Sequence, residues 1–596
     1  MHRVFHDRVH SKAQMTTRHT LPALVLTTFV VLTTVQALLL SPTKDELAFV
    51  GAGLSHWTSG HFESYRVNPP FVRTWSTAVP FILGYRVPLA FTGGSSRMEF
   101  TSARALTNGY REQIGTLLAI ARISQIPFAV CGAIFVWLTA RDLYGSRAAM
   151  IALIFFCVDP TIVAHASLAT CDIPCASSFI ASTWAYLNWK RNQTPKSLCI
   201  FGLLMGVACI IKFSGLFLLL FFLICDLIDL SRKLWTTSTG STAWSLLRGR
   251  LFSWTVVFCI LMAIINSAYL GEGTLRPLKN YVFASEFIRT SYGQQDKSPS
   301  GLDNPFRQSI LGGLLIPVPK HYLLGLDEQK YYFEKGLTGY LFGETKRGGW
   351  WYFYLLAFIV KMPMAFVALM VFSIARRIAK KQTAIEDLVL IGVPLLLLTT
   401  LSWQSNIQCY RYLVPALPLL YVYVAGGIGG NGRWSNSLTV ALLSQSVASL
   451  FLCFPNTISY ASEWAGGYQN CHKWLLDSDC DWGQDAWRLR DAMKKYDGET
   501  IFSALEVYVH PATLGFAYEV PLLESTNTGK GRDDGDETKV QFVVVNANIL
   551  HGIPSSMLEP NGNWHTLPKG ALSHWFDHAS IVEQIGGSIF VLRVQR

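Results

Sequence analysis

The feature that most constrains this chain is the recurrence of long apolar runs along most of its length. A helix crossing the roughly 30 Å hydrocarbon core of a bilayer needs about 20 apolar residues, since only a helix satisfies its backbone polar groups internally. Eleven such runs lie at about 21–40, 117–139, 148–168, 174–189, 198–212, 213–229, 251–270, 351–375, 386–402, 411–429 and 436–454. We therefore predict a mainly α-helical, polytopic membrane protein with about 11 transmembrane helices.

The charge pattern supports a membrane protein over a nucleic-acid-binding one. Charged residues make up 15% of the chain, against about 25% in soluble globular proteins. The net charge is +11, but the Lys and Arg residues punctuate the apolar runs and form no continuous face. We therefore expect membrane lipids, and no nucleic acid, among the partners.

One apolar stretch, residues 198–229, carries Lys212 near its middle. A charge at the bilayer centre costs at least about 2.5 kcal/mol. We therefore predict two short helices that turn at Lys212.

The charges of the short loops predict the orientation. Basic residues alternate between loops in a way that places the N-terminus in the cytoplasm, and the first run is interpreted as a retained signal anchor. A membrane domain then covers residues 1–455, with outer loops at about 41–116 and 271–350 that contain interfacial helices. Residues 456–596 form a small soluble α/β domain on the outer face, with helical signals at 481–497 and strand-like runs at 541–545 and 588–594.

Two adjacent acids, Asp45 and Glu46, follow the first apolar run. A loop that contains Tyr65 and ends in a Pro pair comes next, and Arg73 follows it. A carboxylate beside such a loop suits a general base that deprotonates an acceptor hydroxyl at the bilayer surface. The alternative is that the two acids simply mark a helix end.

Further charged residues are predicted at the same membrane surface. Asp172 ends one span, Lys212 lies at an outer turn, and Arg411 follows Tyr410 at the start of another span. Cations at headgroup depth suit a lipid-linked phosphate. A structural ion pair of Asp172 and ordinary snorkelling of the cations are the alternatives.

The second outer loop and the tail offer weaker candidates. His321, Glu344 and Arg347 could belong to a loop over a headgroup-level cavity. The acids at 477, 479 and 481 do not match a calcium loop, because its sixth position is Trp482 and its twelfth is Arg488. Cys471 and Cys480 could pair. No nucleotide-binding or zinc motif is present, so no metal site and no certain cofactor is predicted.

These segments, in this order, resemble the GT-C class of phospholipid-carrier-dependent membrane glycosyltransferases, related to protein O-mannosyltransferases and to lipid A aminoarabinose transferases. The resemblance extends to about residue 490. Its residues are Asp45-Glu46, Asn68-Pro69-Pro70, Thr170-Cys171-Asp172, Lys212-Phe213-Ser214, Gly343-Glu344, Arg347-Gly348-Gly349-Trp350-Trp351, Arg411-Tyr412-Leu413, Ser459-Tyr460, Gly466-Gly467, Asp477-Ser478 and Asp481-Trp482-Gly483-Gln484-Asp485.

The resemblance implies an inverting hexosyl or pentosyl transferase that takes a sugar from a polyprenyl-phosphate donor, as in protein glycosylation or cell-envelope modification. Asp45 matches the catalytic base, Asp172 a second acidic position, and Lys212 and Arg411 the cations around the carrier phosphate. The complete predicted site comprises the catalytic residues Asp45, Glu46 and Asp172, the donor-phosphate residues Lys212, Arg411 and Arg347, and the substrate-cavity residues Arg73, Tyr65, Glu344, His321 and Tyr410.

Several features stay open at this stage. The acceptor is a protein, a glycan or a lipid, a divalent metal requirement is undecided, and Cys171 and Cys480 depart from the family pattern, which leaves the sugar undefined. The family's distribution favours the bacterial inner membrane over the endoplasmic reticulum. The alternatives to an enzyme are a transporter or lipid flippase, whose charged residues would gather near the bilayer midplane, and a catalytically silent assembly partner.

Overall fold

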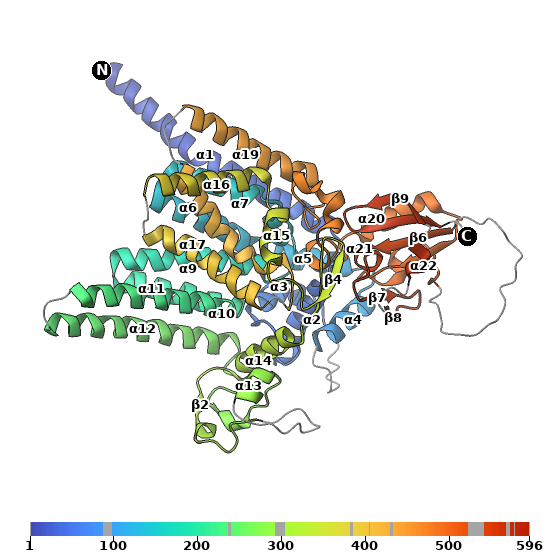
Figure 1. The fold of residues 1–596 in the computed structure, drawn as a ribbon, viewed down its shortest axis with the longest axis horizontal. Helices are drawn as coiled ribbons and strands as arrows, with labels where there is room; N and C mark the ends of the chain where they lie inside the picture. Colours follow the sequence, from blue (N-terminus) through green and yellow to red (C-terminus); the bar gives the residue numbers. More distant parts are fainter. Residues whose placement is uncertain are drawn as a thin grey trace, which may run out of the picture.

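The structure is a computed structural model in which a bundle of long helices adjoins a smaller region that contains a β-sheet (Figure 1). It describes residues 2–87, 98–236, 240–291, 304–381, 385–404, 406–428, 433–521, 541–567, 572–576 and 579–594. Within these ranges, only the backbone is described for residues 2–19, 290–291, 433–435 and 573–574.

The helical bundle confirms the predicted mainly α class. Its helices run through the blue, green, yellow and orange parts of the chain in Figure 1. They are α1 (His2–Leu39), α5 (Ile114–Ile123), α6 (Ile126–Tyr144), α7 (Ser146–Val158), α8 (Pro160–Ala166), α9 (Asp172–Asn192), α10 (Pro195–Ile211), α11 (Gly215–Thr236), α12 (Gly240–Ala268), α15 (Phe353–Lys361), α16 (Met364–Ala379), α17 (Ile385–Trp403), α18 (Leu417–Ile428) and α19 (Arg433–Cys453).

Several of these helices are long and apolar enough to cross a membrane. Within the described ranges, six segments meet this criterion, and the count rises to eight if each of two bent helix pairs forms one span. The pairs are α7–α8, bent by 61°, and α15–α16, bent by 115°. The length and apolar composition of these helices identify the chain as an integral membrane protein. The predicted number of eleven spans stays a prediction.

The predicted turn at Lys212 is confirmed. Helix α10 ends at Ile211, Lys212 adopts an extended conformation with φ −150° and ψ 144°, and α11 begins at Gly215. A second break lies at Asp159, whose extended backbone separates α7 from α8. The Asp159 carboxylate caps α8 by accepting hydrogen bonds from the backbone N–H groups of Thr161 and Ile162.

The two predicted outer loops contain short helices and hairpins. The first loop holds α2 (Lys44–Ser59), α3 (Phe71–Ile82) and α4 (Met98–Gly109). The second holds β1 (Arg276–Pro277), η1 (Leu278–Asn280), α13 (Glu286–Ser291), η2 (Ile310–Gly313), β2 (Leu315–Ile316), α14 (Lys320–Lys335), β3 (Thr338–Leu341) and β4 (Glu344–Arg347). Strand β1 pairs with β2 and β3 with β4, both antiparallel.

The C-terminal region contains a four-stranded sheet of order β5-β6-β10-β9. Strand β5 (Ile501–Ala504) is parallel to β6 (Gln541–Asn546), whereas β10 (Ile589–Val594) is antiparallel to β6 and β9 (Ala579–Ile585), with Val591 opposite Val544.

The other elements are η3 (Tyr410–Tyr412), η4 (Val414–Ala416), η5 (Glu463–Ala465), η6 (Tyr468–Lys473), η7 (Asp477–Asp479), α20 (Ala486–Ala492), η8 (Met493–Tyr496), η9 (Pro511–Thr513), α21 (Ala547–Leu550), the antiparallel pair β7 (Ser555–Leu558) and β8 (Trp564–Leu567), and α22 (Ser573–Phe576).

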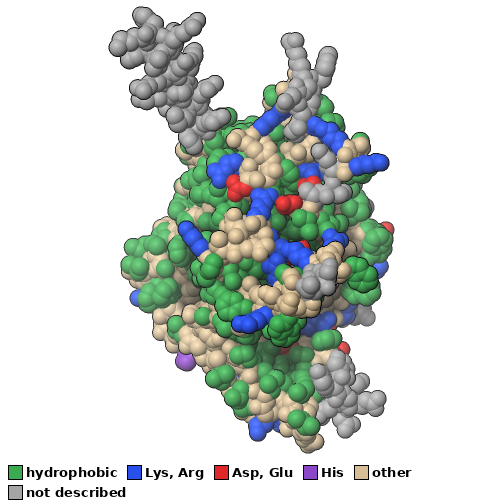
Figure 2. Space-filling view, turned by 90° about the vertical axis from the view of Figure 1, so that its left-hand side faces the viewer, with side chains coloured by type: hydrophobic (Ala, Val, Ile, Leu, Met, Phe, Trp, Pro, Cys, Tyr) green, Lys and Arg blue, Asp and Glu red, His purple; other side chains and the backbone are tan. Residues whose placement is uncertain are grey.

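Basic side chains gather at the end of the bundle that lies away from the sheet. Figure 2 looks onto this end and shows Lys and Arg side chains over much of it. Arg141, Arg191 and Lys233 belong to helices α6, α9 and α11, and each exposes about two fifths of its side chain. This distribution matches the loop charges that predict a cytoplasmic face here.

Helix α18 is almost entirely buried within the bundle. It packs against α16 at Gly427, where an added Cβ atom would lie 2.7 Å from the Cβ and 3.0 Å from the Cα of Ser373. We predict that Gly427→Val lowers the thermal unfolding midpoint of the detergent-purified protein, because overpacking costs about 1–3 kcal/mol.

The matched control is Gly249→Val in α12, since an added Cβ atom at Gly249 meets nothing within 4 Å. Both substitutions place Val in a helix, so only the packing differs between them. Equal unfolding midpoints for the two variants would contradict the close approach of α16 and α18.

Candidate active site

The first turn of α2 is held in place by the buried carboxylate of Glu46. Its Oε1 accepts hydrogen bonds from Arg122 Nε at 2.8 Å and Ala169 N at 2.7 Å, and its Oε2 accepts one from Arg122 Nη2 at 2.7 Å. Glu46 also bonds back to the backbone N–H of Thr43, which caps the helix. The Glu46 side chain is fully buried, is paired with Arg122 and does not line the cavity described below, so the structure places this predicted catalytic residue away from that cavity.

The neighbouring carboxylate of Asp45 leaves the helix in another direction and reaches a cavity. Its Oδ2 lies 2.7 Å from Arg411 Nη1, and the Asp45 side chain is 29% exposed. Arg411 belongs to η3, a turn fixed by the backbone N–H of Tyr410, which donates to both carboxylate oxygens of Asp479 at 2.9 and 3.0 Å. The fold thus places Asp45 against Arg411 although 366 positions separate them in the sequence.

A second ion pair lies on the same cavity. Lys212 Nζ is 2.8 Å from Asp172 Oδ1, and both side chains are almost fully buried. Thr170 Oγ1 donates to Asp172 Oδ2 at 3.2 Å, and His165 Nδ1 is 3.7 Å from the same oxygen. The break between α10 and α11 lets the Lys212 side chain reach Asp172 at the start of α9.

Two aromatic rings lie against the cations of these pairs, and one of them, Tyr412, lies near both. The Tyr412 ring centroid is 5.1 Å from Lys212 Nζ and 5.5 Å from Arg411 Cζ, and the Trp482 ring centroid is 4.5 Å from Arg411 Cζ. These distances suit cation–π attraction. Sequence reasoning missed both aromatics as site residues, although Tyr412 directly follows Arg411 and Trp482 belongs to a motif that carries the family resemblance.

The cavity has a volume of about 460 Å³. Its charged and polar lining consists of Lys44, Asp45, Tyr65, Asn68, Thr170, Asp172, Lys212, Gln329, Tyr332, Lys335, Arg411, Tyr412 and Asp477. A second, mainly apolar cavity of about 240 Å³ adjoins it and shares the residues Lys212, Gln329, Phe333 and Tyr412. This apolar cavity is lined by residues of α11, α14 and α17, such as Phe217, Leu326 and Leu397.

Two ionisable groups at the outer side of the cavity were not predicted as site residues. Burial lowers the pKa of Lys44, but the carboxylates of Glu506 and Asp477 outweigh this effect, so the pKa is raised and Lys44 stays cationic. Burial raises the pKa of Asp477 against the opposing influence of Lys44 and Arg411. Asp477 therefore takes up a proton at a higher pH than an ordinary Asp.

Tyr65 lines the cavity, whereas Arg73 lies in the interior next to the loop that carries Tyr65. Arg73 is fully buried and donates to the backbone carbonyl oxygens of Tyr65 at 2.6 Å, Asn68 at 2.8 Å and Pro69 at 3.0 Å. Its guanidinium also lies 4.6 Å from the Tyr65 ring centroid. Arg73 therefore does not line the cavity, contrary to the prediction, but holds the loop whose Tyr65 and Asn68 side chains do.

The other predicted residues lie outside the cavity. Glu344 and Arg347 are exposed on strand β4, because the hairpin β3–β4 directs them to solvent. His321 is fully buried between Arg66 Nε at 3.2 Å and Glu272 Oε1 at 3.1 Å. Tyr410 is buried beside the cavity without lining it. Among the residues described, no group of three His, Cys, Asp or Glu side chains could hold a metal ion.

Comparison with protein families supports the resemblance over part of the chain. Residues 113–265 match the family described as dolichyl-phosphate-mannose-protein mannosyltransferase. The matched segment contains Asp172 and Lys212, and over these residues the predicted resemblance to protein O-mannosyltransferases is confirmed. The chain has no match among curated proteins.

Three solved structures are distantly similar to this chain. ArnT from Cupriavidus metallidurans, bound to undecaprenyl phosphate, is 12% identical, with a TM-score of 0.44 over 96% of this chain and 97% of that chain. The S. cerevisiae protein O-mannosyltransferase Pmt1-Pmt2 complex, bound to the sugar donor, is 11% identical, with a TM-score of 0.46 over 76% and 94%. The Archaeoglobus fulgidus oligosaccharyltransferase in the apo form is 12% identical, with a TM-score of 0.41 over 86% and 62%. At these TM-scores the similarities do not define the substrates of this chain.

The buried pair of Glu46 and Arg122 yields a stability prediction. Glu46→Gln removes the charge partner of a fully buried guanidinium, which costs about 3–5 kcal/mol. We expect a marked drop in the thermal unfolding midpoint of the detergent-purified protein.

The matched control is Lys495→Gln, which breaks the 2.7 Å pair between Lys495 and Glu583, where the lysine side chain is 64% exposed. An exposed pair contributes about 0–1 kcal/mol. A drop in the unfolding midpoint for Glu46→Gln no larger than that of the control would show that α2 is not anchored by this ion pair.

Proposed function

We propose that this chain is an inverting glycosyltransferase that moves a hexosyl or pentosyl group from a polyprenyl-phosphate donor to an acceptor hydroxyl. One observation carries the proposal. The ion pairs Asp45–Arg411 and Asp172–Lys212 line a single cavity, and this cavity adjoins an apolar one. A lipid-linked sugar phosphate has the same sequence of parts: a polar sugar, an anion and an apolar chain.

The donor would lie across the two cavities. Its phosphate fits between Arg411 and Lys212, and its prenyl chain fits the apolar cavity between α11, α14 and α17. Arg411 can bind the phosphate while it remains paired with Asp45, because a guanidinium has five N–H donors. Its Nε is buried and has no hydrogen-bond partner among the described residues, so this donor remains available.

The chemistry needs one base and a stabilised leaving group. Asp45 accepts the proton of the acceptor hydroxyl, whose oxygen attacks the anomeric carbon from the face opposite the phosphate. The bond between that carbon and the phosphate oxygen breaks, so the sugar is transferred with inversion. Arg411 and Lys212 hold the charge that develops on the departing polyprenyl phosphate.

The positions of these residues favour an enzyme over a transporter. Asp45, Asp172, Lys212 and Arg411 all lie at helix ends or in turns. Their cavity is also lined by Lys44, which pairs with Glu506 of the C-terminal region. Transporters place their substrate sites near the bilayer midplane.

We further propose that the protein lies in the bacterial inner membrane with its N-terminus in the cytoplasm, its C-terminal region in the periplasm, and no resident cofactor.

The base is tested by Asp45→Asn. We expect the release of polyprenyl phosphate from a panel of polyprenyl-phosphate-linked hexoses and pentoses to fall by about 10²- to 10⁴-fold. The control is Glu344→Gln, an exposed acid on β4 outside the cavity, which should keep full activity. Full activity of the Asp45→Asn variant in a folded, membrane-inserted state would remove Asp45 as the base.

The apolar cavity is tested by filling it. Thr400→Trp on α17 places an indole in the space assigned to the prenyl chain, so the Michaelis constant for long-chain donors should rise about tenfold. Leu395→Trp on the same helix is the control, because Leu395 is 51% exposed and does not line the cavity. Equal Michaelis constants for the two variants would place the prenyl chain elsewhere.

A further inference from the structure

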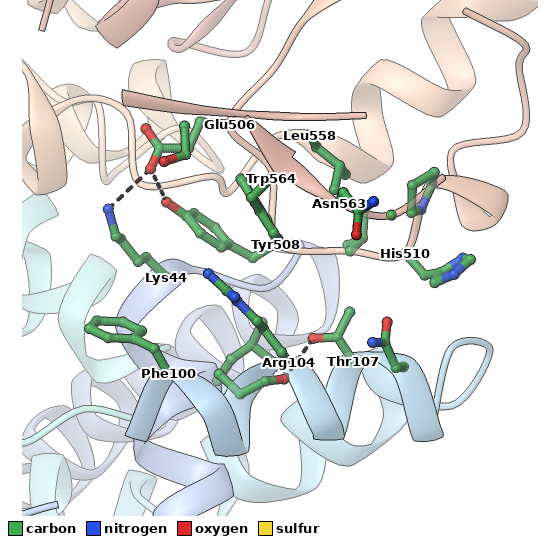
Figure 3. Close-up of a pocket in the computed structure, with 17 residues that line it drawn as sticks. Lys44, Phe100, Arg104, Thr107, Glu506, Tyr508, His510, Leu558, Asn563 and Trp564 are labelled. Carbon is green, nitrogen blue, oxygen red and sulfur yellow. Dashed lines mark hydrogen bonds and ion pairs between the residues drawn. The ribbon is translucent and has the colours of Figure 1, made fainter. Parts of the chain in front are cut away.

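A separate cleft of about 390 Å³ lies between α4 and the C-terminal region (Figure 3). Phe100, Arg104 and Thr107 of α4 form one wall, and Glu506, Tyr508, Leu558 and Trp564 form the other. The cleft adjoins the candidate active site, because Lys44 and Phe100 line both. The cleft and the active-site cavity therefore meet at Lys44 and Phe100, and Asp45 lines the active-site cavity.

One wall of the cleft is a fixed aromatic surface. The rings of Tyr508 and Trp564 stack with centroids 5.4 Å apart and an interplanar angle of 23°. The Tyr508 hydroxyl donates to Glu506, and Lys44 Nζ lies 3.0 Å from the same carboxylate oxygen. These contacts hold the Tyr508 ring and orient the carboxylate toward the junction of the two cavities.

Polar side chains of the cleft retain unused hydrogen-bonding capacity. Arg104, Asn108 and Asn563 line the cleft and are exposed, and their side chains make no hydrogen bond or ion pair with any other residue that the structure describes. Figure 3 shows Arg104 rising from α4 toward Tyr508 and Trp564 on the opposite wall, with Asn563 farther along that wall. Two amides and one guanidinium thus border the aromatic surface.

Resting on the proposed function, we infer that this cleft binds the acceptor and that the acceptor is a water-soluble saccharide. A sugar ring has an apolar face of C–H groups, which fits against an aromatic surface, and an edge of hydroxyl groups. Asn108, Asn563 and Arg104 offer donors and acceptors for these hydroxyls. One hydroxyl of a saccharide that extends past Lys44 reaches Asp45, which takes its proton in the transfer step.

The position of the cleft separates the routes of the two substrates. The apolar cavity for the carrier is lined by α17, a candidate membrane span, whereas no residue that lines the cleft belongs to a candidate span. The donor therefore arrives through the lipid and the acceptor through water. An acceptor that is itself a membrane lipid would need an apolar path that continues to the bilayer. The cleft combines its aromatic surface with amides and charges, and none of its lining residues lies in a candidate span.

The test uses the full-length protein in lipid nanodiscs on an array that carries glucan, mannan, galactan and chitin oligosaccharides beside Ser- and Thr-containing peptides. We expect the protein to be retained by oligosaccharides and not by peptides. Asn563→Ala and Arg104→Ala should each weaken this binding at least fivefold, and Trp564→Ala at least tenfold. Trp235→Ala, a 93% exposed tryptophan of α11, is the matched control and should leave binding unchanged.

Retention by peptides, no retention by any oligosaccharide, or binding that is unaffected by Asn563→Ala would each overturn the inference. Asn563 is exposed and its side chain has no partner among the described residues, so this variant folds even if Trp564→Ala does not. The Asp45→Asn variant separates the two proposals, because it should bind the array normally. Full release of polyprenyl phosphate by that variant would remove Asp45 as the base, whereas no release by the unaltered protein from any donor would overturn the proposed function. Either result would leave the saccharide site standing.

Discussion

The ion pair between Glu46 and Arg122 is the interaction on which the rest of the site depends. Adjacent residues of a helix point in different directions, so fixing Glu46 in the interior directs Asp45 into the cavity. Arg122 also donates to the backbone carbonyl oxygens of Ala37, Leu40 and Ser41, which ties the end of α1 to the start of α2. A single buried guanidinium thus sets the position of the proposed base relative to the first candidate span.

The acidic segment from Asp477 to Asp485 connects the helical bundle to the C-terminal region. Asp479 fixes the turn that carries Arg411, and its backbone carbonyl accepts from Lys361 Nζ at 2.6 Å. Asp481 accepts from Asn546 and Asn548 beside β6, and Asp485 accepts from Ser588 Oγ at 2.8 Å beside β10. The carboxylates of Asp479, Asp481 and Asp485 are therefore engaged in hydrogen bonds that hold the fold together. Asp477 differs because it lines the cavity, although its backbone N–H also bonds to Asn548.

The two proposed substrates would reach the site through cavities of different polarity. The cavity with the ion pairs lies between an apolar cavity bordered by candidate spans and a polar cleft bordered by the C-terminal region. Lys212 and Tyr412 mark one junction, and Lys44 and Phe100 mark the other. The proposed active site thus lies where a lipid-linked donor in the membrane and a water-soluble acceptor outside it would meet.

The sequence by itself determined the helical membrane class and the break at Lys212, and it singled out Asp45, Asp172, Lys212 and Arg411 as candidate site residues, because apolar runs and isolated charges within them are local signals. Only the tertiary structure decided how these charges pair, that Glu46 and Arg73 support the site from behind, and that Glu344, Arg347 and His321 lie outside it. Adjacent acids such as Asp45 and Glu46 are equivalent in sequence. They differ in the fold because one meets a buried guanidinium and the other a cavity, and such partners are chosen by packing between residues far apart in the chain.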